Sequence, residues 1–272
     1  MSESATVFTT GANALHFPNL TMLVASWKAH HAGVPLVVCD YGLNAAQVAL
    51  LRGVPGVYYA PGPTLRGAHA WEGKARLGDY LAPLGLSWQT LVWIDADALF
   101  LQPLPDLGGL LAGYDLLIDA HVQSIGAIMD EGNRRALEVR ADDAYFSSGF
   151  WIVRRGCLLE SYARLAAKVA GQGNLWENDA FVAAIYHEKL KVRTVSGGVW
   201  HARGRTSMPT CAVKGLKAFH DGQPIYVLHA NDGYTLRADG RRIFSRPELA
   251  AIQDHYEGLF WKEIAPPGAA RS

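Results

Sequence analysis

The feature that most constrains this sequence is a short apolar run that ends on two closely spaced aspartates. Residues 91–94 (Leu-Val-Trp-Ile) are strand formers, as is typical of a strand buried on both faces of a parallel sheet. Asp95 and Asp97 follow directly. Side chains at i and i+2 leave the same face of an extended backbone, so both carboxylates are expected together at the carboxyl end of the strand, where open α/β sheets bind their ligands.

Two carboxylates in one place need a compensating charge. A divalent cation such as Mg²⁺ or Mn²⁺ is the usual one, because it takes carboxylate oxygens and keeps other positions open for substrate phosphates. The alternative is a strand that ends in a polar turn, since an isolated Asp-x-Asp is a short motif. The rest of the chain has to decide between these two interpretations.

Before this motif the chain alternates strands and helices. We expect strands at residues 5–10, 35–39 and 57–59, a loop at 11–13, and helices at 18–31 and 45–52. Asn44 can cap the second helix. This order predicts right-handed crossovers and a parallel sheet, whose strand ends would bring Thr9, Thr10 and Asp40 towards the two aspartates.

Composition excludes several classes of protein. With 272 residues, 50% of them hydrophobic and 18% charged, the chain can bury a sizeable core in one large domain. Basic and acidic residues balance at 25 each, so the chain has no net positive charge that would favour binding of nucleic acid. Three widely spaced cysteines without a Cys-x-x-Cys pair argue against a disulfide framework or a structural zinc site. Without a signal-like or membrane-spanning segment, we expect a cytoplasmic protein that meets a membrane at most peripherally.

Residues 90–103 as a whole resemble the Asp-x-Asp segment of the GT-A nucleotide-diphospho-sugar glycosyltransferases. In that superfamily an apolar strand enters the motif and an apolar segment with Pro follows, as Leu-Phe-Leu-Gln-Pro does here. The resemblance implies an α/β fold, a single Rossmann-like GT-A domain with a mostly parallel central sheet flanked by helices. It also implies that Asp97 binds the metal directly, while Asp95 contacts the metal or the nucleotide ribose.

Three further segments before the motif resemble the donor-binding parts of that superfamily. Thr9 and Thr10 stand where the first-strand turn borders the nucleotide, and Asp40 begins a comparable turn after the second strand. Turn and helix capping is the equal alternative for these three residues. Residues 71–82 resemble a helix that offers a Lys or Arg to the donor, and because Lys74 and Arg76 do not share a helical face, we expect only one of them to reach it.

Two segments after the motif resemble the sugar-binding side of such enzymes. Residues 144–153 predict a strand broken by a small-residue turn, with Ser147 where relatives commonly have Asn. Glu177, Asn178 and Asp179 resemble the Asp-Gln-Asp segment that lies beside the anomeric carbon in retaining family 8 glycosyltransferases. The alternative is that these three residues cap the apolar helix that follows them.

The last third offers a further metal ligand and a set of cations. Residues 225–228 are an apolar strand that ends on His229, and a neutral His can complete a carboxylate site for Mn²⁺. His201 is the competing candidate. Between the two histidines lies a basic stretch that could close over a diphosphate or remain a solvated loop, formed by Arg203, Arg205, Lys214 and Lys217.

The function that the resemblance implies is glycosyl transfer. We expect a domain at residues 1–240 and a helical extension at 241–272, moving a sugar from a nucleotide sugar such as a UDP-sugar to a carbohydrate or glycoconjugate hydroxyl, with retention. One alternative, a sugar-1-phosphate nucleotidyltransferase, needs a basic Gly-rich loop after the first strand, and residues 11–13 lack its basic side chains. A non-catalytic carbohydrate-binding protein is the other alternative.

Overall fold

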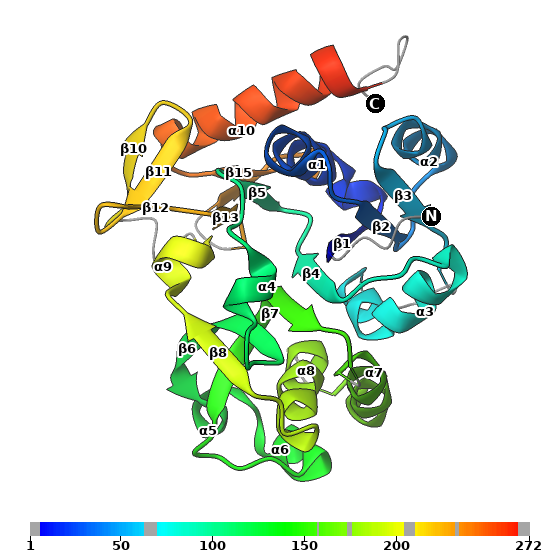
Figure 1. Ribbon diagram of the computed structural model, residues 1–272, viewed down its shortest axis with the longest axis vertical. Coiled ribbons are helices and arrows are strands. Elements are labelled where there is room, and N and C mark those ends of the chain that lie inside the picture. The colour runs from blue at the N-terminus through cyan, green and yellow to red at the C-terminus, as the bar shows by residue number, and fades with distance from the viewer. Residues whose placement is uncertain are drawn as a thin grey trace.

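A seven-stranded, mostly parallel sheet forms the centre of the molecule (Figure 1). The computed structural model describes residues 6–62, 70–156, 158–172, 176–203, 210–231 and 234–265. The strand order is β3–β2–β1–β4–β7–β6–β8, and only β7 runs against its neighbours. The strands are β1 (Thr6–Ala12), β2 (Leu36–Asp40), β3 (Val57–Ala60), β4 (Thr90–Ile94), β6 (Leu116–Ser124), β7 (Ala144–Arg154) and β8 (Val192–Val195). The predicted fold class is confirmed.

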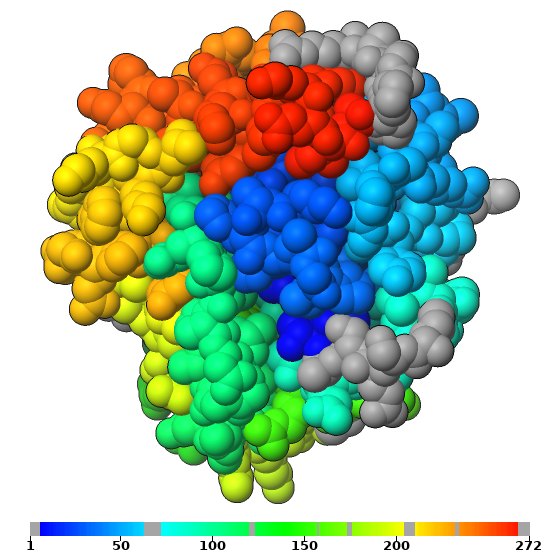
Figure 2. Space-filling model, turned by 45° about the horizontal axis from the view of Figure 1, so that its top comes forward, coloured from blue at the N-terminus to red at the C-terminus, as the bar shows by residue number. Residues whose placement is uncertain are grey.

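Helices cover both faces of this sheet, so each face has its own hydrophobic core. Phe8 points into one core and Val7 into the other, as alternation along a strand requires. The first face is covered by α1 (Phe17–His31), α2 (Ala45–Arg52) and α10 (Pro247–Leu259). The second is covered by α3 (Leu77–Leu81), α6 (Glu131–Leu137), α7 (Leu158–Val169) and α8 (Trp176–His187). In Figure 2 the carboxyl-terminal helix, in red, lies directly against α1, in blue.

Short strands from distant parts of the sequence form a second layer beside the end of β4. One small sheet has the order β5–β13–β9, and a β14–β15 hairpin lies next to it. Their bounds are β5 (Ala98–Phe100), β9 (Ala202–Arg203), β13 (Val227–His229), β14 (Tyr234–Leu236) and β15 (Arg242–Phe244). A further sheet consists of β10 (Ala212–Lys214), β11 (Lys217–His220) and β12 (Gln223–Pro224). The predicted boundary between the domain (1–240) and the helical extension (241–272) falls inside the β14–β15 hairpin. That boundary stays a prediction.

The remaining elements are short helical segments at the connections. The 3₁₀ segments are Ala14–His16, Ala70–Arg76 and Ala82–Leu84, the α-helical ones are α4 (Leu107–Leu110), α5 (Ile125–Ile128) and α9 (Gly197–Trp200), and a π-helical turn covers Phe260–Ile264. Within the described part of the chain, no helix is long and apolar enough to cross a membrane.

Most predicted elements are present, and a few differ in extent. Asn44 caps α2 through a reciprocal capping box with Gln47, as expected. The predicted loop at 11–13 is wrong in part, because pairing with β2 continues β1 to Ala12. Residues 70–76 form 3₁₀ turns before the short α3 rather than one α-helix. The strand at 144–154 is unbroken, since β7 pairs with β4 through residues 150–154, and the irregularity appears in its register with β6.

Candidate active site

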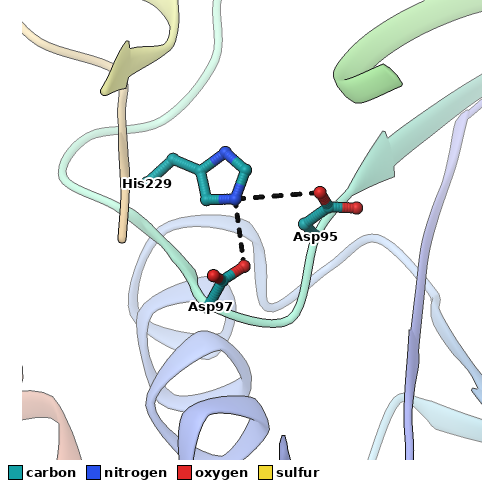
Figure 3. Close-up of side chains that lie close together, drawn as sticks. All are labelled: Asp95, Asp97 and His229. Carbon is teal, nitrogen blue, oxygen red and sulfur yellow. Dashed lines mark hydrogen bonds and ion pairs between the residues drawn. The ribbon is translucent and has the colours of Figure 1, made fainter. Parts of the chain in front are cut away.

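Asp95, Asp97 and His229 meet beyond the carboxyl end of β4 (Figure 3). The two aspartates occupy the turn between β4 and β5, and His229 is the last residue of β13, paired with Ala98. His229 Nε2 lies 3.0 Å from Asp97 Oδ1 and 3.7 Å from Asp95 Oδ2. The sequence predicted this grouping, although a turn rather than extended backbone brings the carboxylates together.

The three side chains suit a divalent metal ion. Each offers one ligand atom, and these atoms lie within 4.8 Å of one another. Two carboxylate oxygens and one imidazole nitrogen are a donor set for Mn²⁺ or Mg²⁺, the nitrogen favouring Mn²⁺. Burial works against the charge of Asp97, but His229 and Arg242 outweigh it and hold its pKa well below the usual range. Asp97 is therefore ionised, as a ligand must be.

Gly149 on β7 lets the cluster pack against the central sheet. A Cβ atom at this position would lie 2.8 Å from His229 Cε1 and 3.2 Å from Asp95 Oδ2. Contacts this close would displace a side chain of the cluster. Ser147 was the residue of this segment expected on the sugar-binding side, and Gly149, two positions later, is the one that contacts the cluster.

A cleft of about 180 Å³ opens beside the cluster. It lies at the carboxyl ends of β1, β2 and β4, where the crevice of an open α/β sheet is expected. Its walls are formed by Gly11, Ala12, His16, Tyr41, Lys74, Trp93, Asp95, Ala96, Asp97 and Arg242.

Tyr41 forms one wall of this cleft. Its ring is held between two glycines, because a Cβ atom at Gly11 or at Gly73 would lie within 2.3 Å of a ring carbon. The buried hydroxyl of Tyr41 has no hydrogen-bond partner among the described residues, so it can serve a ligand. The sequence analysis noted the turn that contains Tyr41 but assigned the contact to its neighbour Asp40.

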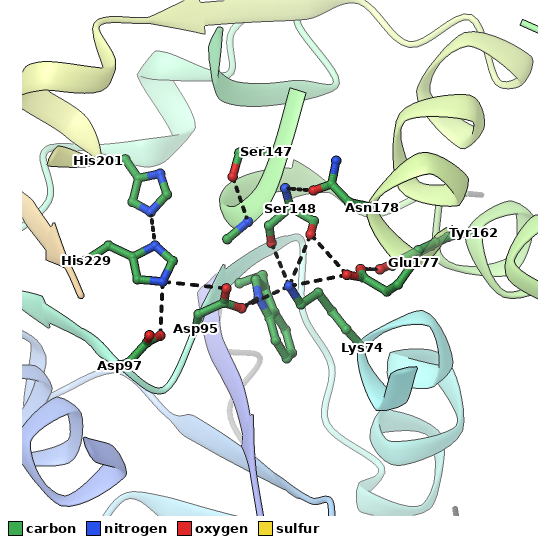
Figure 4. Close-up of polar contacts among 12 residues, drawn as sticks. Lys74, Asp95, Asp97, Ser147, Ser148, Tyr162, Glu177, Asn178, His201 and His229 are labelled. Carbon is green, nitrogen blue, oxygen red and sulfur yellow. Dashed lines mark hydrogen bonds and ion pairs between the residues drawn. The ribbon is translucent and has the colours of Figure 1, made fainter. Parts of the chain in front are cut away.

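Lys74 connects the metal cluster to the head of α8 (Figure 4). Its Nζ lies 3.0 Å from Asp95 Oδ1 and 3.9 Å from Glu177 Oε2, and donates to the Oγ of Ser148 at 3.1 Å. Burial disfavours its charge, but the two carboxylates outweigh this effect and raise its pKa. Lys74 is thus a buried, charged ammonium group at the cleft.

Arg242 is the cation at the cleft that sequence reasoning missed. It comes from β15, and its Nη1 donates to Asp97 Oδ2 at 2.5 Å. The guanidinium lies 4.9 Å from the ring centroid of Tyr234, and its buried Nε has no partner within the described ranges. Since 145 residues separate it from Asp97, no local pattern predicted the contact.

Glu177 and Asp179 lie at the head of α8, both buried. Glu177 accepts hydrogen bonds from Tyr162 and from the Oγ of Ser148, and burial raises its pKa to about 7. Asp179 accepts from Asn133 and from Tyr145, each at 2.8 Å, and burial raises its pKa as well. Both carboxylates are therefore engaged with protein groups, but Glu177 lies nearer the metal cluster.

Asn178 holds the head of α8 against β7. Its Oδ1 accepts from the backbone N–H of Ser148 at 2.7 Å, and its Nδ2 donates to the carbonyl of Phe146 at 2.8 Å. Both ends of the amide are engaged with backbone, so the side chain connects the helix to the strand that carries Gly149.

Of three predicted donor-binding residues, Thr9 and Asp40 are engaged by local structure, whereas the buried hydroxyl of Thr10 has no partner among the described residues. Thr9 is fully buried and donates to the carbonyl of Val92. Thr10 is fully buried as well, on the opposite face of β1. Asp40 accepts from two backbone N–H groups of its own turn and from the hydroxyl of Tyr59. Asp40 therefore closes its own turn, while Asn44 caps the helix that follows, and neither threonine lies in the wall of the cleft.

Three predicted cations lie outside the cleft. Arg76 is exposed and pairs with Asp79, so of the two basic residues of its segment only Lys74 reaches the site, as their faces predicted. Lys214 and Lys217 face each other, exposed, at the β10–β11 turn. His30 lies in the last turn of α1, and burial together with the nearby charge of Lys217 lowers the pKa of His30. The cleft lies at the other end of α1. Residues 204–209, including Arg205, lie outside the described residues.

The comparisons with known proteins agree with this architecture. No protein-family model matches the sequence, and a search of curated proteins found no match either. The galactosyltransferase LgtC, solved with donor and acceptor sugar analogs, is similar over 96% of this chain and 98% of its own, with a TM-score of 0.60 and 13% identity. The chain has the GT-A glycosyltransferase fold.

Two further solved structures share this GT-A fold. An active-site mutant of LgtC gives a TM-score of 0.61 at 13% identity, again over 96% of this chain and 98% of that one. The bifunctional glycosyltransferase WbbM is similar over 75% of this chain, but over only 41% of its own length, with a TM-score of 0.50 and 15% identity.

Proposed function

We propose that this protein is a metal-dependent glycosyltransferase that moves a sugar from a nucleotide sugar, such as a UDP-sugar, to a hydroxyl of a carbohydrate or glycoconjugate. The observation that carries the proposal is the convergence of Asp95, Asp97 and His229 at the cleft of a GT-A fold. A solved protein of this fold bound donor and acceptor sugar analogs.

The proposed chemistry needs charge to be offset at the departing diphosphate. A bound Mn²⁺ or Mg²⁺ would supply Lewis-acid stabilisation of that charge. Asp95, Asp97 and His229 would hold the ion. Arg242 is the nearby cation with an unpaired donor, so we assign to it the diphosphate contact that the sequence suggested for Lys214 and Lys217.

The contacts at the head of α8 support a retaining course. An inverting enzyme needs a carboxylate as general base within hydrogen-bond reach of the acceptor hydroxyl. The oxygens of Glu177 and Asp179 are engaged by protein donors, and Asp179 contacts Asn133 and Tyr145 rather than the cleft. Asn178, the amide of the segment that resembles the one beside the anomeric carbon, holds β7, so its part would be to position Ser148 and Gly149.

A panel of nucleotide sugars tests the proposal. Metal-dependent release of free nucleotide from one donor, with a glycoside formed when an acceptor is added, is the expected result. Proton NMR of the first-formed glycoside should show the same anomeric configuration as the donor. A nucleotidyltransferase would instead release pyrophosphate from a nucleoside triphosphate and a sugar-1-phosphate, and a carbohydrate-binding protein would release no nucleotide from any donor.

A further inference from the structure

A buried line of side chains extends from His229 away from the cleft. His201 Nε2 lies 2.6 Å from His229 Nδ1, and the two rings are stacked with centroids 4.8 Å apart. On its other side, His201 Nδ1 lies 3.3 Å from Asp119 Oδ1, and Asp119 Oδ2 lies 3.2 Å from Arg203 Nη2. His201 and Asp119 are completely buried, and His229 is 2% exposed.

The chemistry of these groups determines the direction of each proton. The permanent charge of Arg203, 3.2 Å from Asp119 Oδ2, favours the carboxylate form of Asp119. A carboxylate can only accept, so His201 Nδ1 carries the hydrogen that faces it. In a neutral imidazole the other nitrogen is then an acceptor. His201 Nε2 therefore accepts the Nδ1–H of His229, so Nε2 is the nitrogen that His229 turns towards the aspartates. Nε2 makes a hydrogen-bond contact of 3.0 Å with Asp97 Oδ1 in the metal-free chain, and a bound ion would replace that contact.

The line also joins two separate sheets. His229 and Arg203 are paired neighbours on β13 and β9 of the small sheet, and Asp119 is on β6 of the central sheet. Asp95 and Asp97 follow β4 of the same central sheet. Asp119 thus positions the imidazole that comes from one sheet relative to the carboxylates that come from the other.

We propose that His201 and Asp119 are positioning residues that fix the Nδ1–H tautomer of His229 and aim its Nε2 at the metal site. This inference rests on the proposed function for the presence of a metal. Outer partners of a ligating histidine commonly change metal affinity by about 10- to 100-fold. Neither residue touches the cleft, so neither is a catalytic residue.

Two substitutions of His201 separate positioning from packing. His201→Phe keeps a ring that can stack on Phe150 and His229 but removes the acceptor. His201→Gln keeps a polar atom near the place of Nε2. Titration of the full chain with Mn²⁺, followed by electron paramagnetic resonance of the free ion, should show about 10- to 100-fold weaker binding for His201→Phe and substantial rescue by His201→Gln.

Asp119→Asn provides a second, independent readout. An amide can donate to His201 Nδ1, which would reverse both hydrogen bonds and place the hydrogen of His229 on Nε2. Nitrogen-15 NMR of histidine-labelled protein saturated with Mg²⁺, with His229→Ala for assignment, should show the Nδ1–H form in the wild type and its loss in Asp119→Asn.

The outcomes distinguish this inference from the proposed function. Equal Mn²⁺ affinity of wild type and His201→Phe would overturn the inference alone. Equal losses in both His201 variants, with equal drops in melting temperature, would assign His201 to packing and overturn it too. If the wild type binds no divalent ion, the proposed function fails, while the presence of the His229 Nδ1–H in the metal-free wild type, and its loss in Asp119→Asn, still tests the hydrogen-bond direction.

Discussion

At the scale of single residues, Glu177 links the site to pH. Burial raises its pKa from 4.5 to about 7, so between these values the folded chain holds a proton that the unfolded chain has released. Its contribution to the free energy of unfolding is complete below pH 4.5 and is lost as the pH rises to about 7. We expect the free energy of unfolding of the wild type to fall over this window relative to Glu177→Gln by about 1–3 kcal/mol.

Urea denaturation in the presence of a chelator measures this difference. The matched control is Glu131→Gln, because Glu131 is an exposed carboxylate paired with Arg135 on α6. Its difference from the wild type should not change with pH. A difference between wild type and Glu177→Gln that stays constant from pH 4.5 to pH 7.5 would contradict a raised pKa.

Arg242 allows a second prediction at this scale. Arg242 contacts Asp97 in the ligand-free chain, and under the proposed function it binds the diphosphate of the donor. Arg242→Ala should leave Mn²⁺ binding no weaker, since Asp97 gains a free oxygen, but should weaken UDP binding at saturating Mn²⁺ by about 10- to 100-fold, as for a lost charge-assisted hydrogen bond. Titration calorimetry measures the dissociation constant of Mn²⁺ and that of UDP. Arg76→Ala is the control, and an unchanged UDP affinity in Arg242→Ala would remove Arg242 from the site.

Single residues were predictable from the sequence where they end an apolar strand. Asp95 and Asp97 follow β4 and His229 ends β13, so strand pattern and side-chain chemistry identified them as candidates, and the resemblance to GT-A enzymes favoured the metal interpretation. Arg242 and Tyr41 were not predictable in this way. Arg242 depends on where a distant hairpin docks, and the position of Tyr41 depends on the glycines that make room for its ring.

At the scale of elements, β7 supports the cluster through Gly149. Gly149→Ala should favour the strand itself, because Ala has a lower backbone entropy cost than Gly. It should nevertheless weaken Mn²⁺ binding by about tenfold or more, because the new Cβ would press on His229 and Asp95. Gly33→Ala is the matched control, since a Cβ there meets nothing within 4 Å. Equal Mn²⁺ affinity in both variants would show that β7 leaves room for a methyl group.

The elements differ in how far the sequence predicted them. Alternating strand and helix patterns with short connections were sufficient for β1 to β3, α1 and α2, because their pairing is local. The small sheet β5–β13–β9 joins segments more than 100 residues apart, which periodicity cannot match. The basic hairpin at Lys214 and Lys217 matches the solvated alternative for a related reason, since charge alone does not say where a hairpin packs on the rest of the chain.

At the scale of the whole molecule, the active cleft is where the two layers of the chain meet. The turn after β4 supplies Asp95 and Asp97, the 3₁₀ segment before α3 supplies Lys74, and the later segments supply His229 and Arg242. The same arrangement of layers is shared with LgtC at only 13% identity, because hydrophobic pattern and strand order can persist when most side chains differ.

Calorimetric titration of UDP tests the central claim, that a metal held by Asp95, Asp97 and His229 carries the nucleotide diphosphate. UDP should bind the wild type with saturating Mn²⁺, lose at least tenfold in affinity after exhaustive chelation, and regain it when Mn²⁺ is restored. Asp97→Asn should remain folded by circular dichroism and bind UDP equally weakly with or without Mn²⁺, whereas the exposed control Asp79→Asn should match the wild type. A UDP affinity of the wild type that is the same with and without Mn²⁺ would contradict the claim.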